Sequence, residues 1–292
     1  MTQRSFIVGS EWLYYKIYSG PKASDLILTE IVLPCLQSLK ERNCIEKWFF
    51  IRYADPKHHI RLRFLVSDKK HIPIIMDELF VHLEGLIAKD IVWKVQLDTY
   101  HRELERYGDN TMELSESLFC ADSLATIRFL DLIEGDEGEE LRWLFGLRAI
   151  EVLLSCFQYG LDEKLGLMEQ LKIGFGREFN MSRPLKKQLD DKYRKEREGI
   201  EQFMRFTAEE EPDYIPILDI LGETHNKIAP IAKKILEVEK KDALQMSKNN
   251  LMGSYIHMLM NRLFKSKNRL NEMVCYDFLY RHYRTKKARR KS

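Results

Sequence analysis

The stretch WFFIRYADPKHHIRLRF, residues 48–64, decides the predicted fold of the first part of this chain. It is typical of two short strands joined by a turn, because aromatic and β-branched residues flank the turn-forming ADPK. Successive side chains of a strand point to opposite faces of a sheet. The second strand would therefore bury its apolar residues on one face and place His59, Arg61 and Arg63 on the other.

This row of potential cations has two interpretations. Half-solvated sheets commonly alternate apolar and polar residues, so the row could be ordinary surface. Exposed faces usually mix charges of both signs, however, and two arginines beside a histidine repel one another unless an anion neutralises them. Because a planar guanidinium offers two parallel hydrogen bonds to a carboxylate or phosphate, the row also suits an anion site. Arg52 could join that site or pair with Asp55 of the turn.

The segments around this stretch predict an α+β fold. WLYYKIY (12–18) and IVWKVQLDTY (91–100) are strand-like, whereas residues 24–41 and 72–88 have apolar residues at helical spacing. Pro34 is expected to kink the first helix or to end a turn of it. The order β-α-β-β-α-β predicts a ferredoxin-like antiparallel sheet with both helices on one side. The other face is then free to build a site or to meet a second lobe.

From about residue 113 the pattern predicts helices. GDEGEE (135–140) and EEEPDY (209–214) are predicted loops, because glycine, proline and polar residues gather there. We therefore expect an α/β lobe over residues 1–110 packed on a mostly helical lobe over residues 111–292, which could together form one compact domain. The segments with helical periodicity are residues 113–133, 139–158, 183–206, 216–241 and 249–266.

The composition is that of an ordinary folded protein. The chain has 292 residues, 45% of them hydrophobic, and a formal net charge of +2. A charge so close to zero gives no reason to expect nucleic acid, and hence none to expect direct binding of tRNA. The basic end, RHYRTKKARRKS (281–292), is interpreted as a solvated terminus rather than a contact for RNA or an acidic partner.

Targeting and metal signals are missing from the sequence. The N-terminus has no signal peptide, and no apolar run approaches the roughly 18 residues of a membrane span, so we expect a soluble cytoplasmic protein. Five scattered cysteines predict buried thiols rather than a disulfide framework or a CxxC metal pair. No Walker A loop, GxGxxG, HExxH or GxSxG is present, and we predict neither a metal nor a cofactor.

Two later segments could carry chemistry. TYHRELERYGDN (99–110) places Arg102 and Arg106 four residues apart, where a helical turn would let them form salt bridges or reach the sheet face. In SYIHMLMNRL, His257 and Asn261 lie one helical turn apart on an apolar helix. Such a histidine is usually a hydrogen-bonded core residue, yet imidazole is also the default proton-transfer group near neutral pH.

Taken together, these stretches resemble the C-terminal domain of lantibiotic dehydratases, also called the thiopeptide-type bacteriocin biosynthesis domain. The pattern of that family includes WLYxKxY, WFFIRYxDPxxHxRLRF, YxRExxRYG and a terminal SxIHMxxNRL. The chain has WLYYKIY, WFFIRYADPKHHIRLRF, YHRELERYG and SYIHMLMNRL in the same order. The resemblance covers nearly the whole chain, but residues 120–245 match only in being helical.

The resemblance implies an activity and partners. In full-length dehydratases a large glutamylation domain uses glutamyl-tRNA to esterify Ser and Thr of a precursor peptide, and this domain then eliminates glutamate to leave dehydroalanine or dehydrobutyrine. The chain is too short to contain the glutamylation domain, so we expect a free-standing lyase that acts with a separate glutamylating protein and the precursor peptide. The resemblance does not decide whether the protein forms a homodimer. The alternatives are an enzyme that joins two dehydroalanines in a formal [4+2] cycloaddition to a pyridine-type ring, and a non-catalytic subunit that holds the precursor.

The resemblance also implies site residues. The elimination residues of the family carry over onto Arg61 and Arg63, onto an arginine of YHRELERYG for which Arg102 is preferred, and onto His257. The arginines would stabilise negative charge on the departing glutamate and on an enolate intermediate, and His257 would move the proton. This chemistry requires no cofactor or metal. Substrate-binding roles are expected for Arg52, His59, Arg106, Tyr107 and Asn261.

Overall fold

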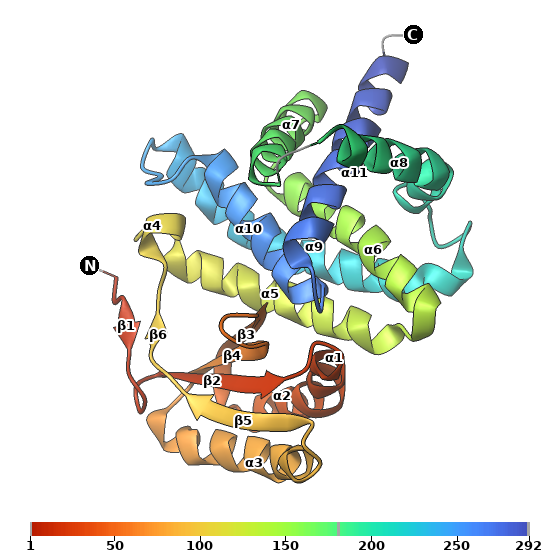
Figure 1. The fold of residues 1–292 in the computed structure, drawn as a ribbon. Coiled ribbons are helices and arrows are strands. Elements are labelled where there is room, and N and C mark those ends of the chain that lie inside the picture. Colours follow the sequence, from red (N-terminus) through yellow and green to blue (C-terminus); the bar gives the residue numbers. More distant parts are fainter. Residues whose placement is uncertain (1, 180–181, 291–292) are drawn as a thin grey trace.

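The computed structural model describes residues 2–179 and 182–290 and has the expected α+β architecture (Figure 1). Its main sheet is antiparallel, with the strand order β3-β4-β2-β5 that a ferredoxin-like β-α-β-β-α-β chain produces. The predicted turn ADPK therefore joins the neighbouring strands β3 and β4. The four strands are β2 (Trp12–Ser19), β3 (Ile45–Tyr53), β4 (His59–Val66) and β5 (Val92–Leu97).

Helices cover one face of this sheet. They are α1 (Ala23–Leu26), α2 (Leu33–Glu41) and α3 (Ile72–Ala88), the last of which follows a short 3₁₀ turn, Lys69–His71. The apolar residues of β4 point toward them, and Ile60, Leu62 and Phe64 are fully buried in this core. This face is the one that the alternating pattern of the second strand predicted to be apolar.

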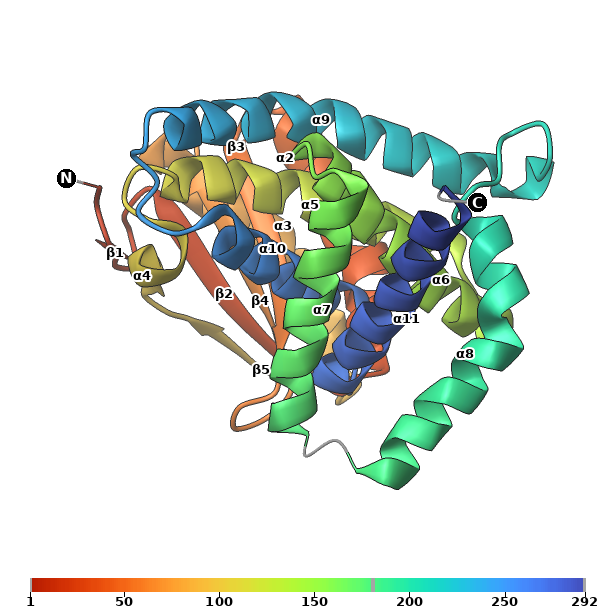
Figure 2. The same ribbon diagram turned by 90° about the horizontal axis from the view of Figure 1, so that it is seen from above.

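The other face of the sheet meets the helical part of the chain. In Figure 2, α5 and α10 lie over the sheet, while α7 and α11 run side by side farther out. Trp12, Tyr14 and Phe49 of the sheet belong to the same buried cluster as Phe119 and Tyr255 of these helices. The helices of this part are α4 (Leu104–Tyr107), α5 (Met112–Leu132), α6 (Gly135–Cys156), α7 (Leu161–Glu178), α8 (Arg183–Phe203), α9 (Ile215–Lys240), α10 (Lys248–Leu263) and α11 (Asn268–Arg289), with a 3₁₀ turn at Pro212–Tyr214.

The last predicted strand, residues 91–100, is in fact two. β5 ends at Leu97, where the Asp98 carboxylate accepts a hydrogen bond from the Thr99 N–H at 2.7 Å and turns the chain. The next residues form β6 (Tyr100–His101), which pairs with β1 (Ser5–Phe6) outside the main sheet. This small ribbon delivers the segment that follows it to the junction of the sheet and the helices.

Two helix boundaries also differ from the prediction. GDEGEE is not a loop, since α6 begins at Gly135; acidic residues such as Glu137 favour the positive end of a helix dipole, which the loop interpretation overlooked. Pro34 does not end its helix either. The interruption expected there takes the form of a π-helical stretch, Ile27–Val32, that passes directly into α2.

From Arg281 to Arg290, the basic end of the chain is not a free solvated terminus. It continues α11, which the sequence analysis did not single out, and its cations pair with other helices. Arg281 Nη2 lies 2.6 Å from Asp190 Oδ1 of α8, and Arg289 Nη1 lies 3.0 Å from Glu201 Oε2. Residues 291–292 of the predicted tail lie outside the described residues. Of the remaining helices, α7 was likewise not singled out.

All five cysteines have free thiols, four of them buried and Cys120 half-buried, which agrees with the prediction of buried thiols. Over residues 2–179 and 182–290, no helix combines the length and the apolar character needed to span a membrane.

Candidate functional site

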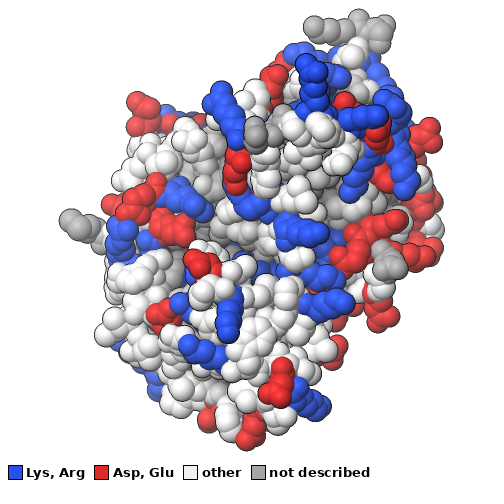
Figure 3. Space-filling model, in the orientation of Figure 1, with Lys and Arg blue, Asp and Glu red and all other residues white. Residues whose placement is uncertain are grey.

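His59, Arg61 and Arg63 lie on the sheet face that meets the helical part, as the alternation along β4 predicted. In Figure 3, Lys and Arg side chains gather across the middle of this side of the molecule, where the sheet and the helices join. The sheet face that carries these three residues is therefore a junction between two layers rather than an open surface. Their strand neighbours are mostly aromatic: Tyr18, Lys16 and Tyr14 in β2, and Tyr53, Ile51 and Phe49 in β3.

Arg63 is a buried cation enclosed by aromatic rings. Its Cζ lies 4.3 Å from the ring centre of Tyr14, 4.9 Å from that of Tyr100 and 5.2 Å from that of Phe49. Only 7% of the residue is exposed, and its buried Nε and Nη1 atoms have no hydrogen-bond partner. Burial lowers the pKa of Arg63, which marks the charged form as poorly compensated. A guanidinium with unused donors is prepared to bind an anion.

Arg61 and His59 form a coupled pair beside Arg63. The guanidinium of Arg61 stacks on the ring of Tyr53, with Cζ 3.5 Å from the ring centre, and its Nε donates to His59 Nε2 at 3.0 Å. His59 Nε2 is therefore an acceptor, so the ring proton is on Nδ1, 2.8 Å from the carbonyl of Lys57. Burial lowers the pKa of His59, and Arg61 lowers it further. His59 is thus a neutral residue that orients Arg61.

His257 lies in a pocket of about 540 Å³ between α4, α7, α10 and α11. Its Nδ1 is 2.9 Å from Glu272 Oε2, and its Nε2 is 3.1 Å from Asn261 Nδ2, the neighbour one turn away that the sequence indicated. Arg106 and Arg269 contribute cations to the same wall. An imidazole held by a carboxylate, in a polar pocket with two guanidiniums, is equipped for proton transfer next to an anion.

Arg102 and Arg106 have separate environments. Arg102 forms a bidentate ion pair with Glu116, with Nε–Oε1 and Nη2–Oε2 both at 2.7 Å, and the two side chains are buried. Its donors are therefore engaged within the protein. Arg106 is partly exposed, pairs with Glu103 at 3.2 Å and lines the His257 pocket. The structure thus brings Arg106, rather than the preferred Arg102, to the histidine.

Glu103 connects the sheet face to the pocket. It pairs with Arg106, and its charge also acts on Arg63, where it opposes the effect of burial on the pKa. Tyr107 lies alongside, buried, with its hydroxyl unpartnered and its ring 5.8 Å from that of Tyr255. Burial raises the pKa of Tyr107 far above its usual range, so the hydroxyl remains a proton donor. Glu103 therefore contacts Arg106 directly and acts on Arg63 only through its charge.

Arg52 is not on the cation face. Its partner in β4 is Ile60, whose side chain is buried under the helices, and the Arg52 guanidinium lies 2.6 Å from Asp25 of α1. Its Nε donates to the carbonyl of Arg262 at 2.8 Å. Arg52 therefore contacts Asp25 instead of the predicted Asp55, and it does not lie beside Arg63. Strand alternation points residue 52 away from residues 61 and 63.

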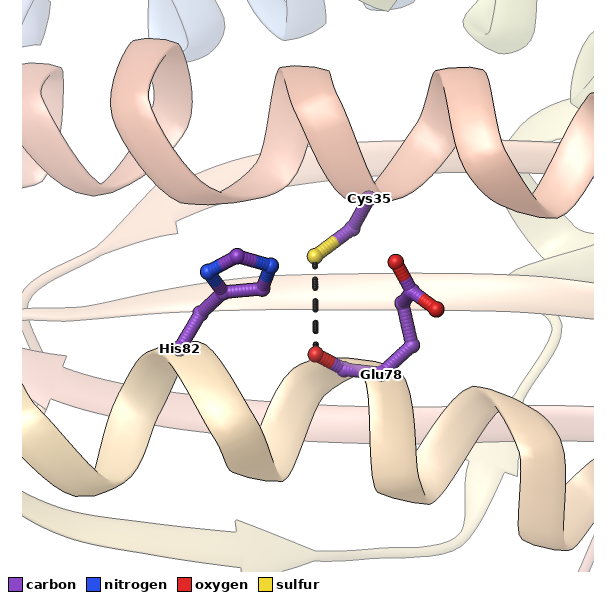
Figure 4. Close-up of side chains that lie close together, drawn as sticks. All are labelled: Cys35, Glu78 and His82. Carbon is purple, nitrogen blue, oxygen red and sulfur yellow. Dashed lines mark hydrogen bonds between the residues drawn. The ribbon is translucent and has the colours of Figure 1, made fainter.

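Among the described residues, Cys35, Glu78 and His82 form the one group of three whose donor atoms could hold a metal ion, all within 4.8 Å of one another (Figure 4). Donors on tetrahedral zinc lie less than about 4 Å apart, because metal–ligand distances are about 2.0–2.3 Å. Here burial raises the pKa of the Cys35 thiol to about 12, and Glu78 pairs with Arg42 Nη1 at 3.3 Å. We therefore assign this group to the packing of α2 on α3.

Several residues of the site were not found by sequence analysis. Glu272 and Arg269 come from α11, and Tyr14 comes from the first predicted strand. Tyr14 carried a usable signal, since it shares the face of Trp12 in an alternating strand. Glu272 carried none, because its contact with His257 joins two helices and follows no local spacing.

Comparisons with known proteins agree with the fold. The family model "Lantibiotic biosynthesis dehydratase C-term" matches residues 12–283. Nisin biosynthesis protein NisB of Lactococcus lactis subsp. lactis is 37% identical over 158 residues, which are 53% of this chain and 15% of that protein. Subtilin biosynthesis protein SpaB of Bacillus subtilis is 27% identical over 162 residues, again 15% of its own length. The chain therefore spans a small share of these relatives.

Two of the solved structures that share this fold are a lantibiotic dehydratase and a pyridine synthase. One is the crystal structure of the tRNA-dependent lantibiotic dehydratase MibB from Microbispora sp. 107891, with a TM-score of 0.73 and 21% identity over 98% of this chain and 29% of that one. The other is the pyridine synthase TbtD from thiomuracin biosynthesis, with a TM-score of 0.64 and 13% identity over 94% of this chain and 100% of that one. At these identities the likeness is one of fold.

Proposed function

The chain belongs to the lantibiotic biosynthesis dehydratase C-terminal family, and from this premise we propose that it eliminates glutamate from glutamylated Ser or Thr of a ribosomally made precursor peptide. The products are dehydroalanine and dehydrobutyrine. The proposed partners are the precursor peptide and a separate glutamyl-tRNA-dependent protein that forms the ester. The observation that supports this most is Arg63, a buried guanidinium whose Nε and Nη1 atoms have no hydrogen-bond partner among the described residues. The buried guanidiniums of Arg52, Arg102, Arg142 and Arg262 each contact a carboxylate instead.

The reaction needs a base and a place for negative charge. The proton on Cα is removed, a double bond forms between Cα and Cβ, and the Cβ–O bond of the ester breaks so that glutamate departs as a carboxylate. In this proposal Arg63, supported by Arg61, stabilises the carboxylate and the enolate-like charge that precedes it. Aromatic walls exclude water around Arg63 and so strengthen that interaction.

His257 is the proposed proton-transfer group. It lies in a pocket that a peptide side chain could enter, and general acid–base catalysis by such a residue typically contributes about 10²–10⁴ in rate. For the arginine that the family resemblance places in YHRELERYG, we propose Arg106, because it lines this pocket while Arg102 is held by Glu116. Glu103 would hold Arg106 in place until the substrate carboxylate replaces it.

The test is the intact mass of the precursor peptide coexpressed with its glutamylating partner and this protein. Wild type should convert glutamyl adducts to water losses, and His257→Ala should leave the adducts. His225→Ala, an exposed histidine on α9, is the matched control and should behave as wild type. Water losses that persist at full yield with His257→Ala would contradict the proposal and favour a non-catalytic, peptide-holding role.

A second candidate is the formal [4+2] cycloaddition to a pyridine-type ring. It is favoured by one observation, the fold shared with a pyridine synthase along that enzyme's whole length. The same mass measurement separates the two reactions. A macrocycle formed with release of the leader peptide, from a substrate already dehydrated by other proteins, would replace elimination as the assigned activity.

A further inference from the structure

Glu272 is a buried carboxylate at the back of the His257 pocket. Only 1% of the residue is exposed, and three groups donate toward it. His257 Nδ1 lies 2.9 Å from Oε2, Arg269 Nη1 lies 3.2 Å from Oε2, and the Tyr276 hydroxyl lies 2.7 Å from Oε1. A carboxylate is found in such a position only when hydrogen bonds and cations compensate its burial. Both oxygens are therefore fixed in place.

The contacts decide which nitrogen of His257 carries the proton. Nδ1 also lies 3.3 Å from Arg269 Nη1, but an arginine only donates and a carboxylate only accepts, so Nδ1 cannot serve both. The shorter contact is with Glu272, and the position of Arg269 is explained by its own bond to the same carboxylate. Nδ1–H therefore donates to Glu272. Nε2 is left as the basic nitrogen, which accepts from the Asn261 amide at 3.1 Å.

The charges around this imidazole come from several elements. Tyr276 and Arg269 are on α11 with Glu272, Glu178 of α7 pairs with Arg269, and Arg106 of α4 faces the pocket. Burial and the neighbouring Glu272 raise the pKa of Tyr276 well above its usual range, so its hydroxyl keeps its proton and always donates. Glu272 is the carboxylate that contacts the ring directly, whereas Glu178 acts on it only through Arg269.

From this network we propose that Glu272 is a positioning residue for His257. It holds the ring with the proton on Nδ1, so that Nε2 can take the Cα proton in exchange for the Asn261 amide, and it stabilises the imidazolium that results. This inference deepens the proposed elimination and rests on it for its consequence in catalysis. Glu272 itself touches neither substrate nor reacting atoms.

The first readout is independent of activity. ¹⁵N NMR of the histidine rings, with His257→Gln used to assign the His257 signals, should show the Nδ1–H form in wild type at high pH. Glu272→Gln should move the His257 Nδ1–H proton signal upfield, because a neutral amide accepts a weaker hydrogen bond than a carboxylate does. Tyr276→Phe should move that signal downfield, because the carboxylate loses a competing donor and binds the ring proton more tightly. Glu178→Gln is the matched carboxylate control and should leave the tautomer unchanged.

These variants cover the case in which one of them fails to fold. If Glu272→Gln does not give a folded protein by circular dichroism, Tyr276→Phe, which keeps the carboxylate, still tests the coupling by the direction of its shift. Unchanged ring-nitrogen and Nδ1–H proton signals in the folded variants would overturn the proposal. Opposite shifts in Glu272→Gln and Tyr276→Phe support it, because loss of packing alone has no reason to produce opposite signs.

The second readout is elimination from a glutamylated peptide. Glu272→Gln should reduce kcat by about 10²–10⁴-fold with little change in KM. Glu272→Asp should recover part of the rate. If wild type shows the predicted tautomer but eliminates nothing, the proposed function fails and the network stands. If His257→Ala abolishes elimination while Glu272→Gln does not slow it, the positioning role fails and the function stands.

Discussion

The guanidinium of Arg142 on α6 lies 2.7 Å from the carboxylate of Asp25 on α1, across the junction between the sheet and the helical part. Arg52 of β3 approaches the other carboxylate oxygen at 2.6 Å. Both guanidiniums are almost fully buried, so one carboxylate compensates two buried cations from different layers. This contact holds the two layers, and therefore the surfaces of the site, in register.

Asp25→Asn should destabilise the protein by about 3–5 kcal/mol at neutral pH, because it removes the carboxylate that two buried guanidiniums share. Arg142 keeps a second carboxylate, Glu139 at 3.3 Å, whereas Arg52 loses its ion pair. Burial acts to raise the pKa of Asp25, but Arg52 and Arg142 outweigh it and the pKa is lowered. The carboxylate therefore stabilises the fold above its unfolded pKa of about 3.9, and this contribution is lost as the pH falls through the native pKa.

The measurement is urea unfolding of wild type and Asp25→Asn between pH 7 and pH 3. The difference in unfolding free energy should shrink as the pH falls below about 4. Asp131→Asn, an exposed carboxylate at the end of α5, serves as control. An equal loss of stability in the control, or a difference that does not depend on pH, would mean that the Asp25 contact does not hold the layers together.

Arg63→Met should leave stability unchanged or raise it by about 1–3 kcal/mol while it abolishes elimination. Met fills a similar volume, and the replaced cation is buried without partners for Nε and Nη1. Arg262→Met on the facing helix is the matched contrast. Arg262 is fully buried, and its Nη1 lies 2.6 Å from Asp122 Oδ2, so its loss should destabilise by about 3–5 kcal/mol. Thermal unfolding and the peptide-mass assay together measure both effects.

A large loss of stability in Arg63→Met would contradict this interpretation. Were Arg63→Met to unfold the protein as strongly as Arg262→Met, Arg63 would be a structural residue that the aromatic rings stabilise, and the anion site would have to be sought elsewhere.

Arg106→Ala should reduce elimination at least 10²-fold with less than about 0.5 kcal/mol change in stability, because its side chain is partly exposed and paired only at the surface. Arg102→Ala should instead destabilise by about 3–5 kcal/mol, because it strands the buried carboxylate of Glu116. Single-turnover rates on a glutamylated peptide, alongside chemical unfolding, distinguish the two. A folded Arg102→Ala variant that is inactive, with Arg106→Ala active, would restore the role first assigned to Arg102.

Separating the chain after residue 110 should leave neither piece folded on its own. Trp12 and Phe49 of the sheet are buried in one cluster with Phe119 and Tyr255 of the helical part, so the cut would expose large apolar surface on both sides. Circular dichroism and urea unfolding of residues 1–110, 111–292 and the coexpressed pair test this. Cooperative unfolding of the isolated first piece would show an independent domain.

The sequence was sufficient where periodicity carries the information. The alternation in HHIRLRF correctly divided β4 between a buried apolar face and a cation face, and the order of segments gave the ferredoxin-like sheet. His257 and Asn261 were found together because they lie on one helix, one turn apart. These relationships are local, so the residue spacing determines them.

What the sequence could not supply are contacts between elements. Which of Arg102 and Arg106 is held by a buried carboxylate depends on Glu116, which lies on α5, and on the course of the β1–β6 ribbon. Glu272 reaches His257 only because α10 and α11 pack together. The prediction for Arg52 was wrong for a simpler reason. Its charge suggested a place in the anion site, but its position in β3, opposite Ile60, assigns it to the other face of the sheet.

The ring cage of Arg63 also bears on selectivity. Tyr14, Tyr100 and Phe49 hold the guanidinium by their faces, without a formal negative charge of their own. A carboxylate in their place would compete with glutamate and would have to be displaced in every turnover. Neutral rings do not compete in this way, so free glutamate, the product of the proposed reaction, should bind the same cation and act as an inhibitor whose strength falls as ionic strength rises.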